Sequence, residues 1–317
     1  MASTNLTEGE KLKPATKRFC STELNRNLHE QLIFASAMQI FLSVTALLGN
    51  TLILVALHKE TSLHPPSKLL YRNLAITDLC VGIIAEPLSV AYYISVLNER
   101  GDICLYTYQI SFIASNIFCS VSLLTLTAIS VDRLLALMLG LRYRQVVTFQ
   151  RILAFLIAFW ICSVGTTLSS FGNPLIHVQK LLWFTCVTLF LCLVISVLSY
   201  TKIFFTLRHN QVQVQDHLSP GQQTQIMNMA RYKRAVSSAL WVTTTAVVCY
   251  LPFGVAETVI LQEEMTLSIY LTEHFVTTLV YLNSSLNPLL YLWKIREVRQ
   301  AVKDTLRHLC CSPNRLT

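Results

Sequence analysis

Seven long apolar segments divide the chain, and they restrict its fold more than any other feature of the sequence. A helix needs about 20 mostly apolar residues to cross the hydrocarbon core of a bilayer, which is roughly 30 Å thick. The segments that meet this requirement are 32–57, 69–96, 106–138, 152–170, 181–207, 236–261 and 269–293. Within lipid a lone segment satisfies its backbone hydrogen bonds only as a helix. The predicted fold is therefore all-α, a bundle of seven transmembrane helices.

The low content of charged residues argues against a soluble protein. Charged residues make up 13% of the 317 residues and apolar residues 53%, whereas soluble domains carry about 25% charged residues. A net charge of +8 is also compatible with nucleic-acid binding. The charged residues, however, lie in the gaps between the apolar segments, so we expect a membrane-lipid environment and no nucleic-acid partner.

The distribution of Lys and Arg predicts the orientation of the chain. These residues concentrate after the first, third, fifth and seventh segments, whereas the three opposite gaps contain only Arg100 and Lys180. Basic residues mark cytoplasmic loops, so we expect a multi-pass plasma-membrane protein with an extracellular N-terminus. The predicted divisions are an extracellular tail over 1–29, the seven-helix domain over 30–294, and an amphipathic helix with a cytoplasmic tail over 295–317.

Both tails carry signals for covalent modification. Asn5 begins the glycosylation sequon Asn-Leu-Thr in the outer tail. Apolar residues recur at helical spacing between basic residues over 296–309, which predicts a short amphipathic eighth helix on the membrane surface. Cys310 and Cys311 follow this helix and are candidate palmitoylation sites, with two free thiols as the alternative.

Polar side chains in the apolar segments predict a polar centre in the bundle. Asp78 lies near mid-depth of the second segment, where an isolated carboxylate costs several kcal/mol. It must therefore be paired, protonated or bound to a cation. Asn283 and Asn287 share one helix face because they are four residues apart. Together with Ser122 they predict either an oxygen-rich site for a monovalent cation or a hydrogen-bonded network without an ion.

Six short motifs occur in order, each in a different segment. They are Gly49-Asn50, Leu74-Ala75 with Asp78, Asp132-Arg133, Trp160, Cys249-x-x-Pro252 and Asn287-Pro288-x-x-Tyr291. This set resembles the signature of the rhodopsin-like (class A) G-protein-coupled receptors, over about residues 32–311. The resemblance implies a receptor that reports an extracellular ligand to a heterotrimeric G protein, and not an enzyme.

The resemblance also implies roles for individual residues. Arg133 beside Asp132 would be the switch that meets the G protein, and Pro252 and Pro288 would kink their helices. Tyr200 and Tyr291 would move inward on activation. Asn50 would belong to the central polar network, in which Asp78, Ser122, Asn283 and Asn287 would line an allosteric sodium site with Asp78 as the metal-binding carboxylate. No other cofactor is expected.

Several positions depart from the family pattern. The usual Asp-Arg-Tyr is Asp132-Arg133-Leu134, Tyr250 replaces the usual Trp, and no acid near Tyr232 is available to pair with Arg133. The family disulfide has no counterpart because the short loop 171–179 lacks a cysteine. Cys20 is an alternative partner for Cys104, and two unpaired thiols are the other reading. The short loop, the absence of the usual bridge and Cys192 in place of the usual proline of the fifth segment together resemble, more loosely, the melanocortin, cannabinoid, lysophospholipid and adenosine receptor cluster.

The ligand itself is not determined by the sequence and is a small molecule, a lipid or a peptide. Ser115 occupies the position of the amine-receptor aspartate, which argues against a monoamine. Other candidate pocket residues are Glu86, Asn116, Tyr250, Glu257, Thr277 and Tyr281. Glu86 and Glu257 in one cavity would favour a cationic or hydrogen-bond-donating ligand, unless they face water at the helix ends. Glu263, Glu264 and Glu273, assigned to the third outer loop, would attract a basic peptide.

Two other functional classes are compatible with seven helices. A transporter or channel requires a continuous polar path, and no inverted repeat is visible in the sequence. A membrane enzyme requires catalytic groups, and no intramembrane His cluster or Ser/Lys dyad stands out. The receptor is therefore the predicted function, with a transporter or channel as the alternative.

Overall fold

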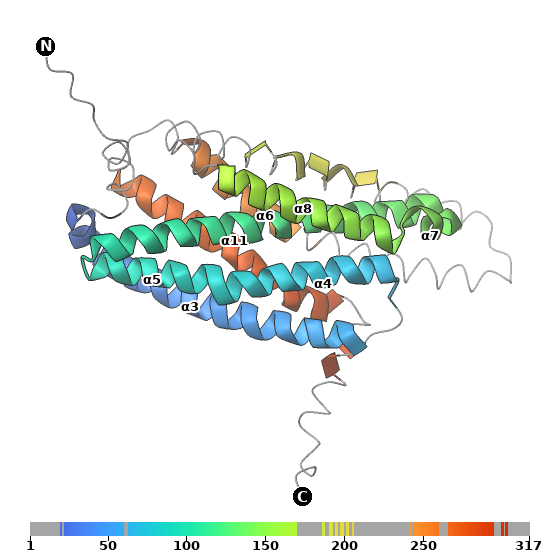
Figure 1. Cartoon of the computed structure of the whole chain (residues 1–317), viewed down its shortest axis with the longest axis horizontal. Helices are drawn as coiled ribbons and strands as arrows, with labels where there is room; N and C mark the ends of the chain where they lie inside the picture. The colour runs from blue at the N-terminus through green and yellow to red at the C-terminus, as the bar shows by residue number, and fades with distance from the viewer. Residues whose placement is uncertain are drawn as a thin grey trace, which may run out of the picture.

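The computed structural model describes residues 22–59, 63–169, 244–259 and 266–294, with residues 20 and 241 and short stretches within 186–205 and 299–303. In these parts of the chain every regular element is a helix, as the sequence predicts. The longest helices lie roughly along one common direction and form a bundle (Figure 1).

Four helical stretches within the described residues are long and apolar enough to cross a membrane, and they correspond to the first four predicted segments. They are Leu28–Lys59 within α3 (Thr22–Lys59); Pro65–Leu97, made of α4 (Pro65–Cys80), the π-helix η1 (Val81–Ala85) and α5 (Glu86–Leu97); α6 (Gly101–Leu139); and α8 (Phe149–Ser169). The short helices η2 (Gly140–Arg142) and α7 (Tyr143–Val146) connect α6 to α8.

The later segments are described in part. The seventh corresponds to α11 (Leu267–Lys294), and the fifth and sixth contain the shorter apolar helices Phe190–Ser199 and Thr244–Val259. Of the predicted eighth helix the structure describes residues 299, 300, 302 and 303, and all four are helical. Asn5, Cys310 and Cys311 lie outside the described residues.

The second transmembrane stretch is interrupted by a π turn. Pro87 has no N–H, and its ring would crowd the carbonyl group one turn earlier in a regular α-helix. The chain widens instead, and the Glu86 N–H donates to the Val81 carbonyl, five residues back. Such a turn inserts one residue and changes the phase of the helix. In α5, after the π turn, the side chains that face the bundle interior are therefore not those that a continuous α-helix would place there.

Two glycines allow the helices at the centre to approach closely. A Cβ on Gly82 would lie 2.9 Å from the Ala46 Cβ, and a Cβ on Gly49 would lie 2.9 Å from the Pro288 side chain. Small residues at helix contacts are a common means of packing in membranes. The Gly49-Asn50 motif therefore sets the contact of α3 with α11, and Gly82 sets the contact of η1 with α3.

A second apolar cluster and a disulfide close one end of the bundle. Leu28, Tyr92, Tyr93 and Tyr270 are buried there beside Cys104. Cys104 is joined to Cys20 by a disulfide, with a Cα–Cα distance of 6.1 Å. This is the pairing that the sequence analysis weighed against two free thiols. The bond attaches the chain just before α3 to the start of α6.

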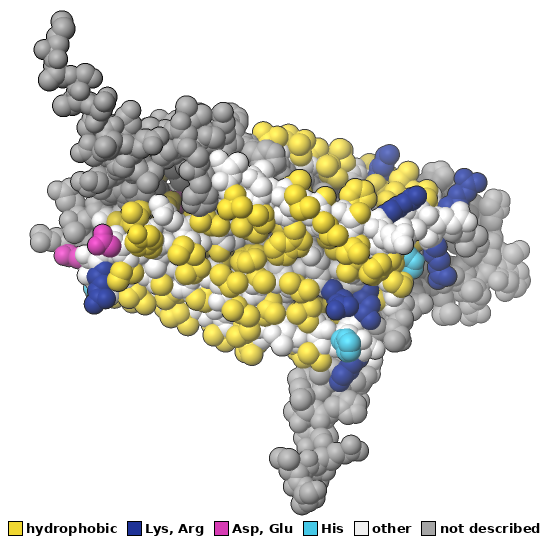
Figure 2. Space-filling view, viewed as in Figure 1, with side chains coloured by type: hydrophobic (Ala, Val, Ile, Leu, Met, Phe, Trp, Pro, Cys, Tyr) yellow, Lys and Arg dark blue, Asp and Glu magenta, His cyan; other side chains and the backbone are white. Residues whose placement is uncertain are grey.

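The surface of the bundle has the banding of a membrane protein. Apolar side chains cover the middle of the visible face, and Lys and Arg side chains gather near the end that carries α7 (Figure 2). Large apolar side chains such as Phe34, Phe41, Phe155 and Ile161 are more than half exposed. An exposed apolar surface of this kind requires lipid around it.

Removing the disulfide is expected to destabilise the end of the bundle that contains Cys104. Because the bond closes a long loop, we expect Cys20→Ser to lower the free energy of unfolding by roughly 2–4 kcal/mol. The measurement is the thermal unfolding midpoint of the purified protein in detergent. Cys162→Ser, which alters an exposed free thiol on α8, is the matched control. Equal midpoints for Cys20→Ser and wild type would contradict the assigned role of the bond.

Candidate functional site

A cavity of about 440 Å³ lies within the bundle near the disulfide end. Its described lining comes from α5, α6, α8, the helix Thr244–Val259 and α11. Six of the predicted pocket residues contribute to it: Ser115, Asn116, Tyr250, Glu257, Thr277 and Tyr281. Cavities of this size hold small organic ligands.

The seventh predicted pocket residue, Glu86, is not part of the described lining. It is 0% exposed, and neither carboxylate oxygen has a hydrogen-bond partner among the described residues. The physical reason is depth. Glu86 directly follows the π turn, and the first residue of α5 to line the cavity is Ser89, about one helical turn nearer the disulfide end.

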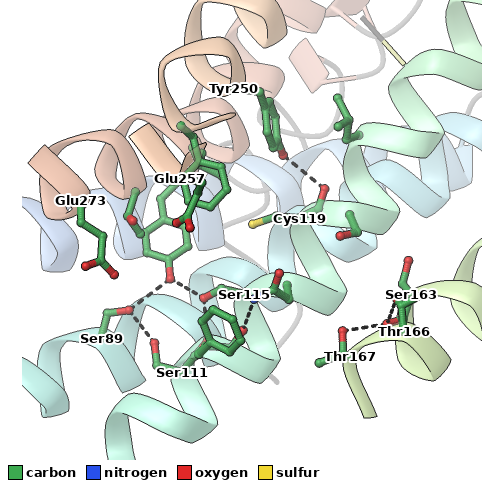
Figure 3. Close-up of a pocket in the computed structure, with 18 of the residues that line it drawn as sticks. Ser89, Ser111, Ser115, Cys119, Ser163, Thr166, Thr167, Tyr250, Glu257 and Glu273 are labelled. Atoms are coloured by element: carbon green, nitrogen blue, oxygen red, sulfur yellow. Dashed lines mark hydrogen bonds between the residues drawn. The ribbon is translucent and has the colours of Figure 1, made fainter. Parts of the chain in front are cut away.

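A cluster of hydroxyl groups lines the cavity between α5, α6 and α11. The Ser89 hydroxyl lies 2.8 Å from that of Ser111 and 3.2 Å from that of Tyr281, and the Tyr281 hydroxyl also contacts Ser115. Figure 3 shows Ser89, Ser111 and Ser115 facing one another around this cluster. Sequence analysis missed Ser89 and Ser111. The signal available for Ser111 was its spacing of four residues from Ser115 on α6.

Two carboxyl groups enter the same cavity. Glu257 is 8% exposed and lines it from the helix Thr244–Val259. Glu273, which the sequence analysis assigned to a loop, lies in the first part of α11 and lines it too. In Figure 3 both side chains lie on the side of the cavity away from Ser163 and Thr167. Glu273 belongs to the helix face that carries Thr277 and Tyr281 at four-residue intervals, which was the missed signal.

Asp78 is held at the centre of the bundle by hydrogen bonds from two helices. Oδ1 accepts from the Ser122 hydroxyl at 3.0 Å and from the Ser284 hydroxyl at 2.9 Å, and Oδ2 accepts from Asn287 Nδ2 at 2.7 Å. Ser284 was not predicted, although it lies three residues before Asn287 and so on the same helix face.

The amide groups around Asp78 keep unused oxygen atoms. Asn50 donates to the Ala46 and Ser284 carbonyls. The Oδ1 atoms of Asn50, Asn283 and Asn287 are buried and accept no hydrogen bond from the described residues. Of the predicted network, Ser122 and Asn287 thus bind Asp78, whereas Asn283 is buried with neither its oxygen nor its nitrogen bonded to a described residue.

Arg133 is held against Asp132 at the α7 end of the bundle. Its Nη2 lies 2.6 Å from Asp132 Oδ2 and also donates to the Ser67 hydroxyl at 2.6 Å. Ser67 donates in turn to Asp132 Oδ2 at 3.0 Å. Tyr143 donates to Asp132 Oδ1 at 2.6 Å. Burial and the neighbouring carboxylate raise the pKa of Tyr143 above its ordinary value, so the phenol remains a donor.

The remaining predicted switch residues are described unevenly. Pro252 lies half-buried in the helix Thr244–Val259, and Pro288 lies inside α11. Tyr200 lies outside the described residues, and so does the side chain of Tyr291. Tyr250, which stands where the family has Trp, donates from its hydroxyl to the Cys119 carbonyl at 3.3 Å.

An apolar helical bundle with a cavity near one end and an Asp–Arg pair near the other defines a multi-pass membrane receptor. The chain belongs to the family described as the 7 transmembrane receptor (rhodopsin family), whose model matches residues 49–172 and 173–291. It is therefore a G-protein-coupled receptor and not an enzyme, and nothing in these comparisons favours a transporter.

Several relatives of the chain are adenosine receptors. The chain is 26% identical to the adenosine receptor A3 of Bos taurus over 301 residues, which cover 88% of this chain and 92% of that receptor. It is 24% identical to the adenosine receptor A2a of Homo sapiens over 303 residues, covering 85% and 71% of the two chains. The looser resemblance to a receptor cluster that includes the adenosine receptors is thus supported.

Removing the Tyr143 hydroxyl is expected to raise basal signalling. Tyr143→Phe deletes one hydrogen bond to a charged partner, and such a bond contributes roughly 1.5–3 kcal/mol. Asp132 then holds Arg133 less firmly, and we expect agonist-independent GTP exchange to increase several-fold. The matched control is Tyr106→Phe, since Tyr106 is 67% exposed on α6. Basal exchange equal to wild type would show that Tyr143 does not restrain Arg133.

Proposed function

We propose that this receptor lies in the plasma membrane with its N-terminus outside, binds a small molecule in the cavity, and activates a heterotrimeric G protein through Arg133. The observation that carries the proposal is the cavity, which five of the described helices line with both apolar and converging polar groups. Its volume of about 440 Å³ suits a small organic molecule. A peptide or a whole lipid would place only part of itself there.

A chain of contacts supports communication between the cavity and the other end of the bundle. Tyr250 lines the cavity and donates to the Cys119 carbonyl on α6. One turn further along α6, Ser122 donates to Asp78, which accepts from Asn287 beside Pro288. A ligand that displaces Tyr250 would disturb α6 next to the Asp78 network. Such a displacement favours a second arrangement of the helices only if the ligand binds that arrangement more tightly.

We further propose that the Asp78 network binds an allosteric sodium ion. The carboxylate has hydroxyl and amide partners but no cationic partner among the described residues. The three unused amide oxygens beside it are buried, and hard cations prefer oxygen ligands. The donor set therefore fits a monovalent cation. When bound, such an ion would neutralise the carboxylate and link α4, α6 and α11.

The relatives suggest the first ligand to test. They are named as receptors for adenosine, which carries several hydrogen-bond donors. The cavity offers matching acceptors in the Ser89–Tyr281 hydroxyl cluster and in Glu257. Adenosine is therefore the reference compound for a ligand screen.

Substituting Arg133 tests the proposed coupling directly. We expect Arg133→Ala to abolish basal and ligand-stimulated GTP exchange on Gα proteins while leaving the receptor at the cell surface. The measurement is GTP exchange in membranes across the Gα classes, normalised to an N-terminal tag that is detected on intact cells. Arg100→Ala, an exposed arginine just before the other end of α6, is the matched control. Unchanged exchange in Arg133→Ala at equal surface expression would refute the assignment.

Neutralising Asp78 tests the sodium proposal. We expect NaCl to raise the thermal midpoint of the purified wild-type receptor relative to choline chloride at the same ionic strength. The Asp78→Asn variant should show no such difference because the charge that attracts the ion is removed. Asp102→Asn removes a carboxylate from the exposed first turn of α6 and serves as the control. A sodium effect of equal size in Asp78→Asn would exclude this site.

A further inference from the structure

We propose that the ligand of the cavity is an organic cation, whose protonated amine or guanidinium group binds between Glu257 and Glu273. This inference rests on the proposed function of the cavity as a small-molecule site. It goes beyond that proposal by assigning the charge of the ligand and the end of the cavity that recognises it.

Among the described lining residues no basic side chain forms an ion pair with the two carboxyl groups, and the lining histidine, His274, contacts the Tyr93 hydroxyl instead. None of the described lining residues is Lys or Arg, and Glu257 makes no hydrogen bond or ion pair with the described residues. Glu273 Oε2 is buried and has no hydrogen-bond partner among the described residues. A carboxylate removed from water is unfavourable unless it is paired. Two such groups in one cavity therefore favour a cation supplied from outside.

Aromatic rings surround this end of the cavity. The ring centroids of Tyr92 and Tyr108 are 5.4 Å apart, and those of Tyr108 and Phe112 are 6.3 Å apart. All three residues line the cavity. Rings attract a cation over their faces, more strongly when water is excluded. Carboxylates combined with aromatic faces favour an ammonium or guanidinium group, whereas a neutral donor would use the carboxylates alone.

The polar groups are divided along the cavity. Glu257 lies near the end of the helix Thr244–Val259, and Glu273 lies near the start of α11. Tyr281, with its hydroxyl partners Ser89 and Ser115, lies two turns further along α11. The complementary ligand therefore has a cationic group at the disulfide end, an apolar or aromatic body, and a hydrogen-bonding group that reaches the hydroxyl cluster.

The position of the carboxylates distinguishes this site from the monoamine pattern. Ser115 stands where an amine receptor carries its aspartate, and its hydroxyl contacts Tyr281. The acidic function is supplied instead by Glu257 and Glu273 on two other helices. An amine would consequently bind nearer to the disulfide end than it would beside residue 115.

The test is a screen of chemically matched pairs on the full-length receptor. Arylalkylamines and arylalkylguanidines are each paired with the neutral N-acetyl or urea derivative of the same skeleton, and adenosine is added as a neutral reference. Binding is measured as a rise in the thermal midpoint of the purified receptor, and binders are then tested for GTP exchange. We expect the cationic member of a pair to bind and its neutral partner to bind much more weakly.

Isosteric variants identify the recognising groups. Glu257→Gln and Glu273→Gln keep the side-chain shape and remove the charge, and each is expected to weaken cation binding roughly tenfold to a hundredfold. Asp102→Asn, which removes an exposed carboxylate outside the cavity, should bind like wild type. Midpoints without ligand report whether each variant is folded.

The other outcomes overturn the inference. The inference is overturned if the neutral members of the pairs or adenosine bind as tightly as the cations. It is also overturned if the cations bind to both Gln variants as tightly as to wild type, or if the screen finds no cationic binder. These results leave the proposed receptor function intact as long as GTP exchange still requires Arg133. Loss of that requirement would instead refute the proposed function itself.

Discussion

The centre of the bundle is organised around the hydrogen bonds to one buried carboxylate, that of Asp78. It is 0% exposed in an apolar protein, where an unsatisfied charge would be strongly destabilising. The surrounding helices therefore have to supply donors, and they do so from Ser122 on α6 and from Ser284 and Asn287 on α11. Gly82, one turn beyond Asp78, lets this part of the chain pack closely against α3. The close packing of four helical elements and the polar centre thus serve the same end, which is to surround the buried Asp78 carboxylate with hydrogen-bond donors.

The two ends of the receptor differ in whether their buried carboxylates have hydrogen-bond partners. At the α7 end, Asp132 is fully provided with partners, because Arg133, Ser67 and Tyr143 all bind it. At the disulfide end, Glu257 has none among the described residues. A satisfied carboxylate stabilises the resting structure, whereas an unsatisfied one leaves interaction energy available to a ligand. The partners of Asp132 from outside α6 are Ser67 on α4 and Tyr143 on α7, so these two elements hold the carboxylate that binds Arg133.

Sequence alone predicted those features that depend on length and on local spacing. Seven apolar segments gave the fold class, and Asn283 with Asn287 gave the polar face of α11 through the four-residue period. The position of Glu86 could not be predicted because the cavity begins about one helical turn nearer the disulfide end, at Ser89, and a π turn at η1 precedes Glu86. Ser67 and Tyr143 were equally hidden, since their role arises from a tertiary contact with Asp132 that no spacing in the sequence encodes.

Glu273 shows why the ligand class could be narrowed only with the structure. In the sequence it follows Glu263 and Glu264, so it resembles part of a solvated acidic loop. In the structure it begins the cavity face of α11 and lies in the same lining as Glu257, which comes from a different helix. A lone buried carboxyl group can remain neutral, but two in one cavity beside aromatic rings form a site with a preferred charge. The family match over residues 49–172 and 173–291 fixes the receptor architecture, whereas the proposed preference for a cation is inferred from these side chains.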